Sequence, residues 1–199
     1  MHSLNRAGIK LNIFYHSQNS KKYANKIFEE LTEEVVMFNE NRLEYLAHMH
    51  FHVLIRFGEW DEILEESLEL RQIFSIYRCI QKFARTLAYA VKGMIPEAEN
   101  EYLSFNESKN GIPAEKRIGH NMAQPVLEVA DAMAKGEILY RKKMYDEAFS
   151  ELRRSCELSD NLIYSEPWDW PQPTRHALGV LLLEQGKVEE AEKVYKEDL

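Results

Sequence analysis

The sequence predicts an all-α fold in which about five helical hairpins stack side by side. Apolar residues recur with helical spacing, and no segment alternates with period two for long enough to be a confident strand. Four short segments share a further pattern: 57–63, 92–98, 142–148 and 185–191. In each, a turn residue is followed by an apolar residue, then by acids, then by a small or aliphatic residue.

Each of these four segments is predicted to be the turn between two antiparallel helices. Gly58, Gly93 and Gly186 can end a helix because glycine adopts a left-handed backbone without steric cost, and Lys143 stands at the equivalent place in the remaining segment. The acids that follow lie near the positive end of the next helix dipole, and Pro96 is tolerated in a first turn. The small or aliphatic residue should face back onto the first helix and be buried.

The hairpins are expected, in chain order, at 4–39, 42–70, 74–106, 123–159 and 173–199. The last is the clearest, with apolar residues from Leu178 to Leu183 before the turn and a stripe that includes Val188, Ala191 and Tyr195 after it. Turn-forming residues predict two inserted loops, at 107–121 and at 160–172.

Two tryptophans lie in the second predicted loop, within the run EPWDWPQP. Trp168 and Trp170 are either pinned onto the neighbouring hairpins or displayed to a partner. A long loop needs something to hold it in place. We therefore expect both side chains to be pinned.

The turns and their flanks resemble the tetratricopeptide repeat. In the last hairpin, Leu178-Gly179, Leu182, Gly186, Ala191 and Tyr195 are similar to the pattern L-G-x2-Y followed by A-x3-F. The residues equivalent to this alanine lie 39, 35, 50 and 43 positions apart, at Ala24, Ile63, Ala98, Ala148 and Ala191. Most of these intervals exceed the repeat length of about 34 residues, which indicates lengthened helices or inserted loops.

This resemblance implies a right-handed α-α superhelix, a single tetratricopeptide-like solenoid over residues 1–199, whose concave face binds other proteins. If Ile63 stands at the small-residue position, the residues expected on that face are Tyr45, His48, His52, Glu137, Tyr140, Arg141 and His176. Family members that bind chaperone tails resemble one another in a clamp of Lys, Asn and Arg on this face. The matching positions here are mostly aromatic and aliphatic, so binding of carboxylate tails there is not expected.

His48, His50 and His52 alternate in the sequence and at first sight look like metal ligands. On a helix, however, His48 and His52 share a face and His50 points elsewhere. Three roles stay open for the pair: solvated or hydrogen-bonded structural histidines, which the scarcity of unpaired buried polar groups favours, partner-binding residues, or metal ligands with Glu44 one turn before. The zincin arrangement needs a glutamate where Met49 stands, so we expect no metal and no other cofactor.

Composition excludes several classes of partner. A net charge of −8 without a basic stripe argues against nucleic acid. No apolar run approaches the length of about 20 residues that crosses a membrane, and the N-terminus lacks the apolar core of a signal peptide. Cys79 and Cys156 are expected to be reduced thiols packed as apolar groups, which suits a cytoplasmic protein.

No nucleotide-binding, esterase or thiol-redox motif is present, and paired acids such as Glu189-Glu190 fit solvated helix faces. We therefore expect a protein–protein interaction scaffold with no catalytic residues, which binds a peptide or a partner helix. The alternative is a structural fragment of a longer helical enzyme or assembly. The apolar stripe of the final helix favours it, because this stripe could pair with a second copy or with a continuation of the chain.

Overall fold

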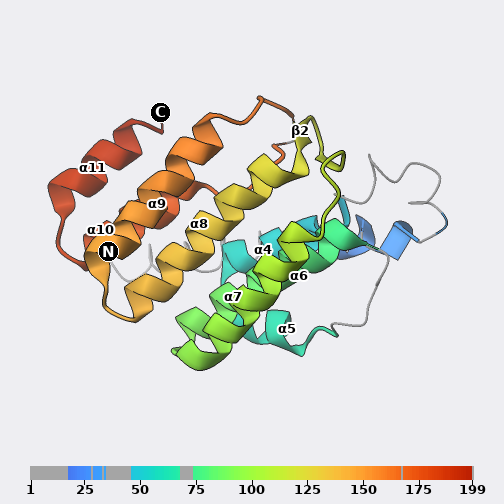
Figure 1. The fold of residues 1–199 in the computed structure, drawn as a ribbon, viewed down its shortest axis with the longest axis horizontal. Coiled ribbons are helices and arrows are strands. Elements are labelled where there is room, and N and C mark those ends of the chain that lie inside the picture. The colour runs from blue at the N-terminus through green and yellow to red at the C-terminus, as the bar shows by residue number, and fades with distance from the viewer. Residues whose placement is uncertain are drawn as a thin grey trace, which may run out of the picture.

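The computed structural model describes residues 18–27, 29–32, 34, 46–67, 74–166 and 168–198. From residue 46 onwards the helices form successive pairs joined by short turns (Figure 1): α4 (Met49–Phe57) with α5 (Trp60–Glu65), α6 (Ser75–Val91) with α7 (Ile95–Asn110), α8 (Ala123–Arg141) with α9 (Tyr145–Asp160), and α10 (Thr174–Glu184) with α11 (Val188–Lys196). Most of the predicted hairpin 4–39 lies outside the described residues. Within it, residues 18–27 are helical and Ala24 is buried.

The four predicted turns are confirmed. Each has a residue in the left-handed conformation, with φ of 71°, 76°, 64° and 72° at Gly58, Gly93, Lys143 and Gly186. Beyond each turn residue, a backbone N–H reaches back five positions, as Met94 N does to Tyr89 O at 2.9 Å. This Schellman arrangement satisfies a carbonyl that would otherwise be left open at the helix end.

The residues predicted to face the first helix of each pair are fully buried: Ile63, Ala98, Ala148 and Ala191. Two glycines make the approach of the helices still closer. A Cβ atom on Gly136 would lie 2.7 Å from Leu152 Cγ, and one on Gly179 would lie 2.5 Å from Tyr195 Cζ. Side chains at these positions would push α9 away from α8 and α11 away from α10.

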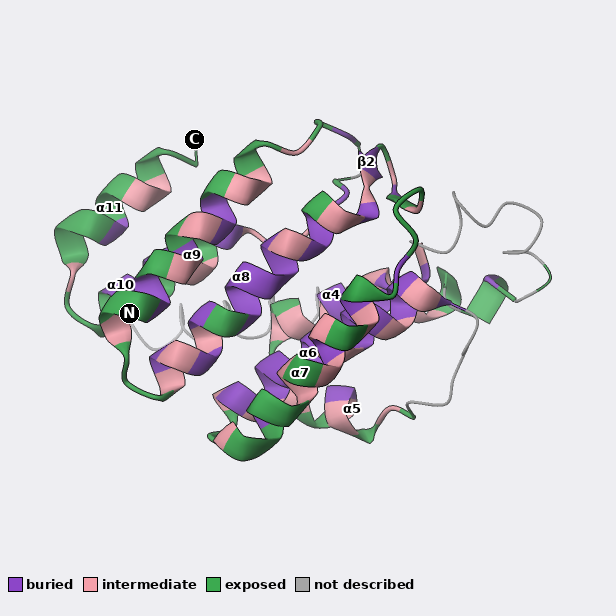
Figure 2. Ribbon diagram, in the orientation of Figure 1, coloured by how far each residue is buried: buried purple, intermediate pink, exposed green. Residues whose placement is uncertain are grey.

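Each helix pair packs against the next one along the chain. Helices α4 and α5 contact α6, helices α6 and α7 contact α8, and α9 contacts α10. Figure 1 shows α8 through the middle of the molecule, with α6 and α7 on one side and α9 and α11 on the other. Burial is concentrated on α6 and α8, whereas α11 is largely exposed (Figure 2).

Two short strands, β1 (Arg117–Ile118) and β2 (Asn121–Met122), pair antiparallel where only a loop was predicted. The expectation of no strand is wrong here, because two residues per strand are too few to show an alternating pattern. Helix α7 also continues to Asn110, beyond the predicted boundary at 106. The described part of the chain is nevertheless all-α in class.

The state of the two cysteines agrees with the prediction from the sequence. Cys79 and Cys156 are free and buried in the hydrophobic core. Within the described residues, no helix combines the length and the apolarity needed to cross a bilayer.

Candidate functional site

The histidines predicted to face a partner are buried instead. The exposed fractions of His48 and His52 are 1% and 2%, and their ring centroids lie 4.9 Å apart. They are covered by the loop between α9 and α10, residues 161–173, which we call the Trp loop; position 167 is not among the described residues. The ring of Trp170, in this loop, packs edge-on against that of His52, with 5.1 Å between the ring centroids. It also packs at a tilt against the ring of Phe83, with 5.4 Å between the centroids. The predicted exposure of His48 and His52 is therefore wrong, because the chain's own loop covers this surface of α4 and α6.

A hydrogen bond joins the end of the Trp loop to α4. The Gln172 amide donates to the carbonyl oxygen of His52 at 2.8 Å and lies 3.2 Å from His52 Nδ1. If this amide also donates to Nδ1, the His52 proton resides on Nε2 and the ring is neutral. Burial favours the same state, because it lowers the pKa of His52 well below 6.5 and that of His48 to about 4.

Asp169 fixes the middle of the Trp loop to the β1–β2 turn. Its Oδ2 accepts hydrogen bonds from the backbone N–H groups of His120 and Asn121, at 2.8 and 3.0 Å, and from Asn121 Nδ2 at 2.7 Å. Asn121 in turn donates to the carbonyl of Ile163 and accepts from its N–H. Gly119, with φ of 58°, makes room for the carboxylate, since a Cβ there would lie 1.8 Å from Asp169 Oδ1.

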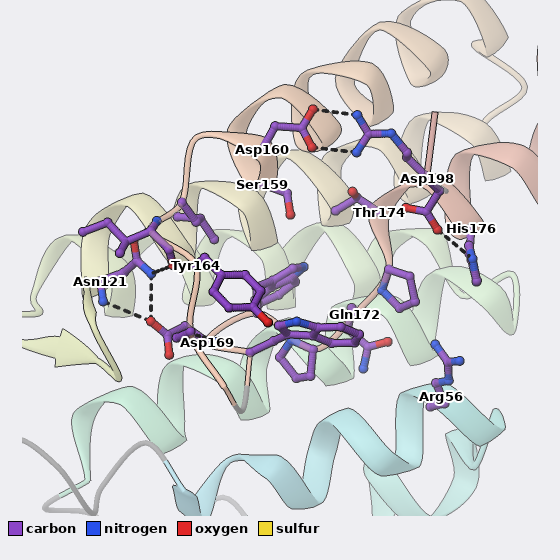
Figure 3. Close-up of a pocket in the computed structure, with 18 residues that line it drawn as sticks. Arg56, Asn121, Ser159, Asp160, Tyr164, Asp169, Gln172, Thr174, His176 and Asp198 are labelled. Atoms are coloured by element: carbon purple, nitrogen blue, oxygen red, sulfur yellow. Dashed lines mark hydrogen bonds and ion pairs between the residues drawn. The ribbon is translucent and has the colours of Figure 1, made fainter. Parts of the chain in front are cut away.

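A cavity of about 760 Å³ lies between the Trp loop, the end of α4 and the first turn of α10 (Figure 3). Three large side chains of the Trp loop line it and remain exposed to solvent: Ile163 by 64%, Tyr164 by 74% and Trp168 by 63%. Trp170, two positions further on, is only 6% exposed. The prediction that both tryptophans are pinned is therefore correct for Trp170 and wrong for Trp168.

The acidic and basic side chains that line the cavity are, in the described part of the chain, Arg56, Asp160, Asp169, Arg175, His176 and Asp198. Asp160 accepts two hydrogen bonds from Arg175, both of 2.6 Å, and these lower the pKa of the Asp160 carboxyl. His176 pairs with Asp198 at 3.0 Å. Arg56, exposed in the last turn of α4, has no ion pair or hydrogen bond from its side chain to any described residue.

Glu137, Tyr140 and Arg141 lie together at the end of α8 and do not line this cavity. Tyr140, 5% exposed, donates to Glu184 Oε2 at 2.8 Å and accepts from Gln185 Nε2 at 2.8 Å. Arg141 pairs with Glu137 at 2.7 Å, while burial raises the pKa of the Glu137 carboxyl. These partners come from the chain itself and hold α8 to the end of α10.

Of the predicted partner-binding residues that the structure describes, only His176 lines the cavity, and Tyr45 lies outside the described residues. No cluster of three or more His, Cys, Asp or Glu side chains suited to a metal ion occurs in the described ranges. Comparison with protein-family models, with curated proteins and with solved structures found no significant match.

The sequence did not identify Arg56 or Tyr164 as candidate binding residues, and it predicted that Trp168 packs against the neighbouring hairpins. The run of aromatic residues and prolines in 164–173 was a usable signal for a surface loop of this kind. It did not reveal which tryptophan turns inward. That depends on the contacts of Trp170 with His52 and Phe83, which lie about 120 and 90 positions away in the chain.

Proposed function

We propose that this chain is a tetratricopeptide-like solenoid that recognises a segment of a partner protein at the cavity beside the Trp loop. The paired helices, the left-handed turns and the buried small residues at their predicted positions support the solenoid. Proteins of this architecture use extended surfaces for binding, and inserted loops commonly carry function. The proposed surface is the outer side of the Trp loop, because its inner side already covers His48 and His52.

The exposure of Trp168 and Tyr164 on a firmly held loop carries this proposal. Large aromatic side chains are enriched among the residues that dominate binding energy at protein interfaces. Asp169 and Trp170, which directly follow Trp168, are buried and fixed by hydrogen bonds and ring contacts. A side chain presented from such a rigid base loses little conformational freedom on binding, which favours affinity.

We predict that Trp168→Ala lowers affinity for the partner at least about tenfold, since interface tryptophans contribute on the order of 2 kcal/mol. Because Trp168 is 63% exposed, the substitution should change the free energy of unfolding of the protein by no more than about 0.5 kcal/mol. Partners would be captured on immobilised wild-type protein and quantified by mass spectrometry, then titrated individually. Leu103→Ala, which removes a 62% exposed side chain from α7, is the matched control. Equal affinity of the Trp168→Ala variant and the wild type would refute the site.

A second candidate function is assembly through the last helix pair. Val180, Leu183 and Val188 are exposed by 50%, 46% and 61%. Val180 and Leu183 are three positions apart and thus share one face of α10. Leu178 and Leu182 are buried on another face of this helix. Exposed apolar residues grouped in this way are typical of surfaces that contact another protein.

If this surface pairs with a second copy, the mass measured by sedimentation should rise with protein concentration towards that of a dimer. The double variant Val180→Ser/Leu183→Ser should then remain monomeric, because it removes the apolar face of α10 without touching the buried residues. Leu103→Ser serves as the control on α7. A wild-type protein that stays monomeric at every concentration would exclude this assembly.

A further inference from the structure

The charges of the cavity indicate which chemistry its ligand carries. We propose that the partner segment presents a carboxylate, which pairs with Arg56, beside an apolar residue that packs on Trp168. This inference rests on the proposed function and names the kind of segment that the site would take. It concerns the outer side of the Trp loop. Neither Arg56 nor Trp168 is among the residues that the sequence predicted for the concave face.

The carboxylates that line the cavity already have hydrogen-bond donors or ion-pair partners within the protein. Asp160 is held by Arg175 through two hydrogen bonds, Asp198 is paired with His176, and Asp169 accepts three hydrogen bonds from the β1–β2 turn. A cationic ligand would therefore have to break one of these contacts before it could form its own. Such an exchange gains little, because each bond formed replaces one of similar strength.

The basic side chains of the cavity are in a different situation, because within the described ranges one of them has no ion pair or hydrogen bond from its side chain. Arg175 and His176 are paired, whereas the guanidinium of Arg56 has no partner among the described residues. In Figure 3, Arg56 stands across the cavity from Asp160, apart from the dashed contacts. An anion is the complement of this arrangement, and a carboxylate matches the planar fork of a guanidinium in two parallel hydrogen bonds.

A peptide carboxylate fits the site better than a polyanion does. Nucleic acid and clustered phosphates need several free cations together, and the chain carries a net charge of −8. A volume of about 760 Å³ is in the range of small-ligand pockets and suits a short segment rather than a folded domain. The exposed faces of Trp168 and Tyr164 supply the apolar contact, as in aromatic grooves that take extended, proline-containing segments.

The test uses degenerate nine-residue peptides as the probe, passed over the immobilised full chain. One library has blocked N-termini and amidated C-termini, and a second has free C-terminal carboxylates. Sequencing of the retained pools gives the residues selected at each position. Selection of Asp or Glu from the amidated library assigns the anion to a side chain. Retention of peptides from the free-acid library alone assigns it to the C-terminal carboxylate.

Individual peptides from the selected pool are then measured against variants by fluorescence polarisation. We expect Arg56→Gln to weaken binding about tenfold or more, Arg56→Lys to weaken it less, and higher salt to weaken the wild type. Arg56→Glu should select Lys or Arg in place of the acid. Arg153→Gln, which removes an exposed cation of α9 that does not line this cavity, should bind like the wild type.

The outcomes separate this inference from the proposed function. If the wild type retains apolar peptides without preferring an acid, and Trp168→Ala abolishes their retention, the carboxylate inference fails and the binding site stands. The inference also fails if acids are selected equally by the wild type and Arg56→Gln. If the wild type retains no peptide from either library, both the inference and peptide recognition at this cavity are wrong.

Discussion

Replacing Asp169 by alanine is expected to lower the free energy of unfolding by about 3–5 kcal/mol. The substitution leaves three donors without their acceptor, namely the backbone N–H groups of His120 and Asn121 and the side-chain amide of Asn121. Each buried donor that loses its partner costs about 1–3 kcal/mol. Urea denaturation followed by circular dichroism measures the change, and Asp169→Asn, which keeps one acceptor oxygen, should lose less.

Gly119→Ala provides a matched test of the same contact. Its Cβ would meet Asp169 Oδ1 at 1.8 Å, and alanine is disfavoured at a φ of 58°. We expect the double variant Gly119→Ala/Asp169→Ala to lose less stability than the two single variants together, because the alanine at 119 then occupies the space of the missing carboxylate. Strict additivity would show that the carboxylate does not contact the turn in solution.

The second large effect is a loss of stability in mild acid caused by His48 and His52. Below pH 6.5 the unfolded chain takes up protons on these side chains, while burial keeps them neutral in the folded protein. Stability therefore falls as the pH is lowered from about 6.5 to about 4, where His48 titrates in the fold. For His48 alone, at about 1.4 kcal/mol per pH unit, the loss is about 3 kcal/mol, and His52 adds to it in the same direction.

Other groups also titrate in this range, so the measurement is a difference between two proteins. Urea denaturation from pH 7.5 to pH 4.5 would compare the wild type with His48→Met/His52→Leu. The variant should lose less stability than the wild type as the pH falls. His120→Gln, which alters an exposed histidine on the β1–β2 turn, should follow the wild type. Parallel curves for all three proteins would contradict the role of the buried pair.

Much of the helical architecture could be predicted from short stretches of sequence. Gly93 predicts a turn because its left-handed conformation suits glycine, and the next alanine, Ala98, predicts a close contact because of its size. These properties depend on residues within one or two helical turns of each other. The β1–β2 hairpin could not be predicted, because a strand of two residues is too short to show an alternation of apolar and polar residues.

The candidate site could not be predicted in the same way. Helical periodicity placed His48 and His52 on one face of a helix, which is correct, but not beneath a loop that follows more than 100 residues later. It also gave no reason to separate Trp168 from Trp170. Their different exposure arises from the fit of one indole between α4 and α6.

The sequence by itself thus determined the all-α class, the positions of the four turns and the burial of the small or aliphatic residue after each turn, because these follow from local backbone preferences and the spacing of apolar residues. Only the tertiary structure decided which surface remains open. The hydrogen bonds of Asp169 and Gln172 and the burial of Trp170 close the Trp loop over α4 and leave Trp168 and Arg56 facing solvent. Contacts between such distant residues depend on how the helix pairs stack, and no local pattern encodes that.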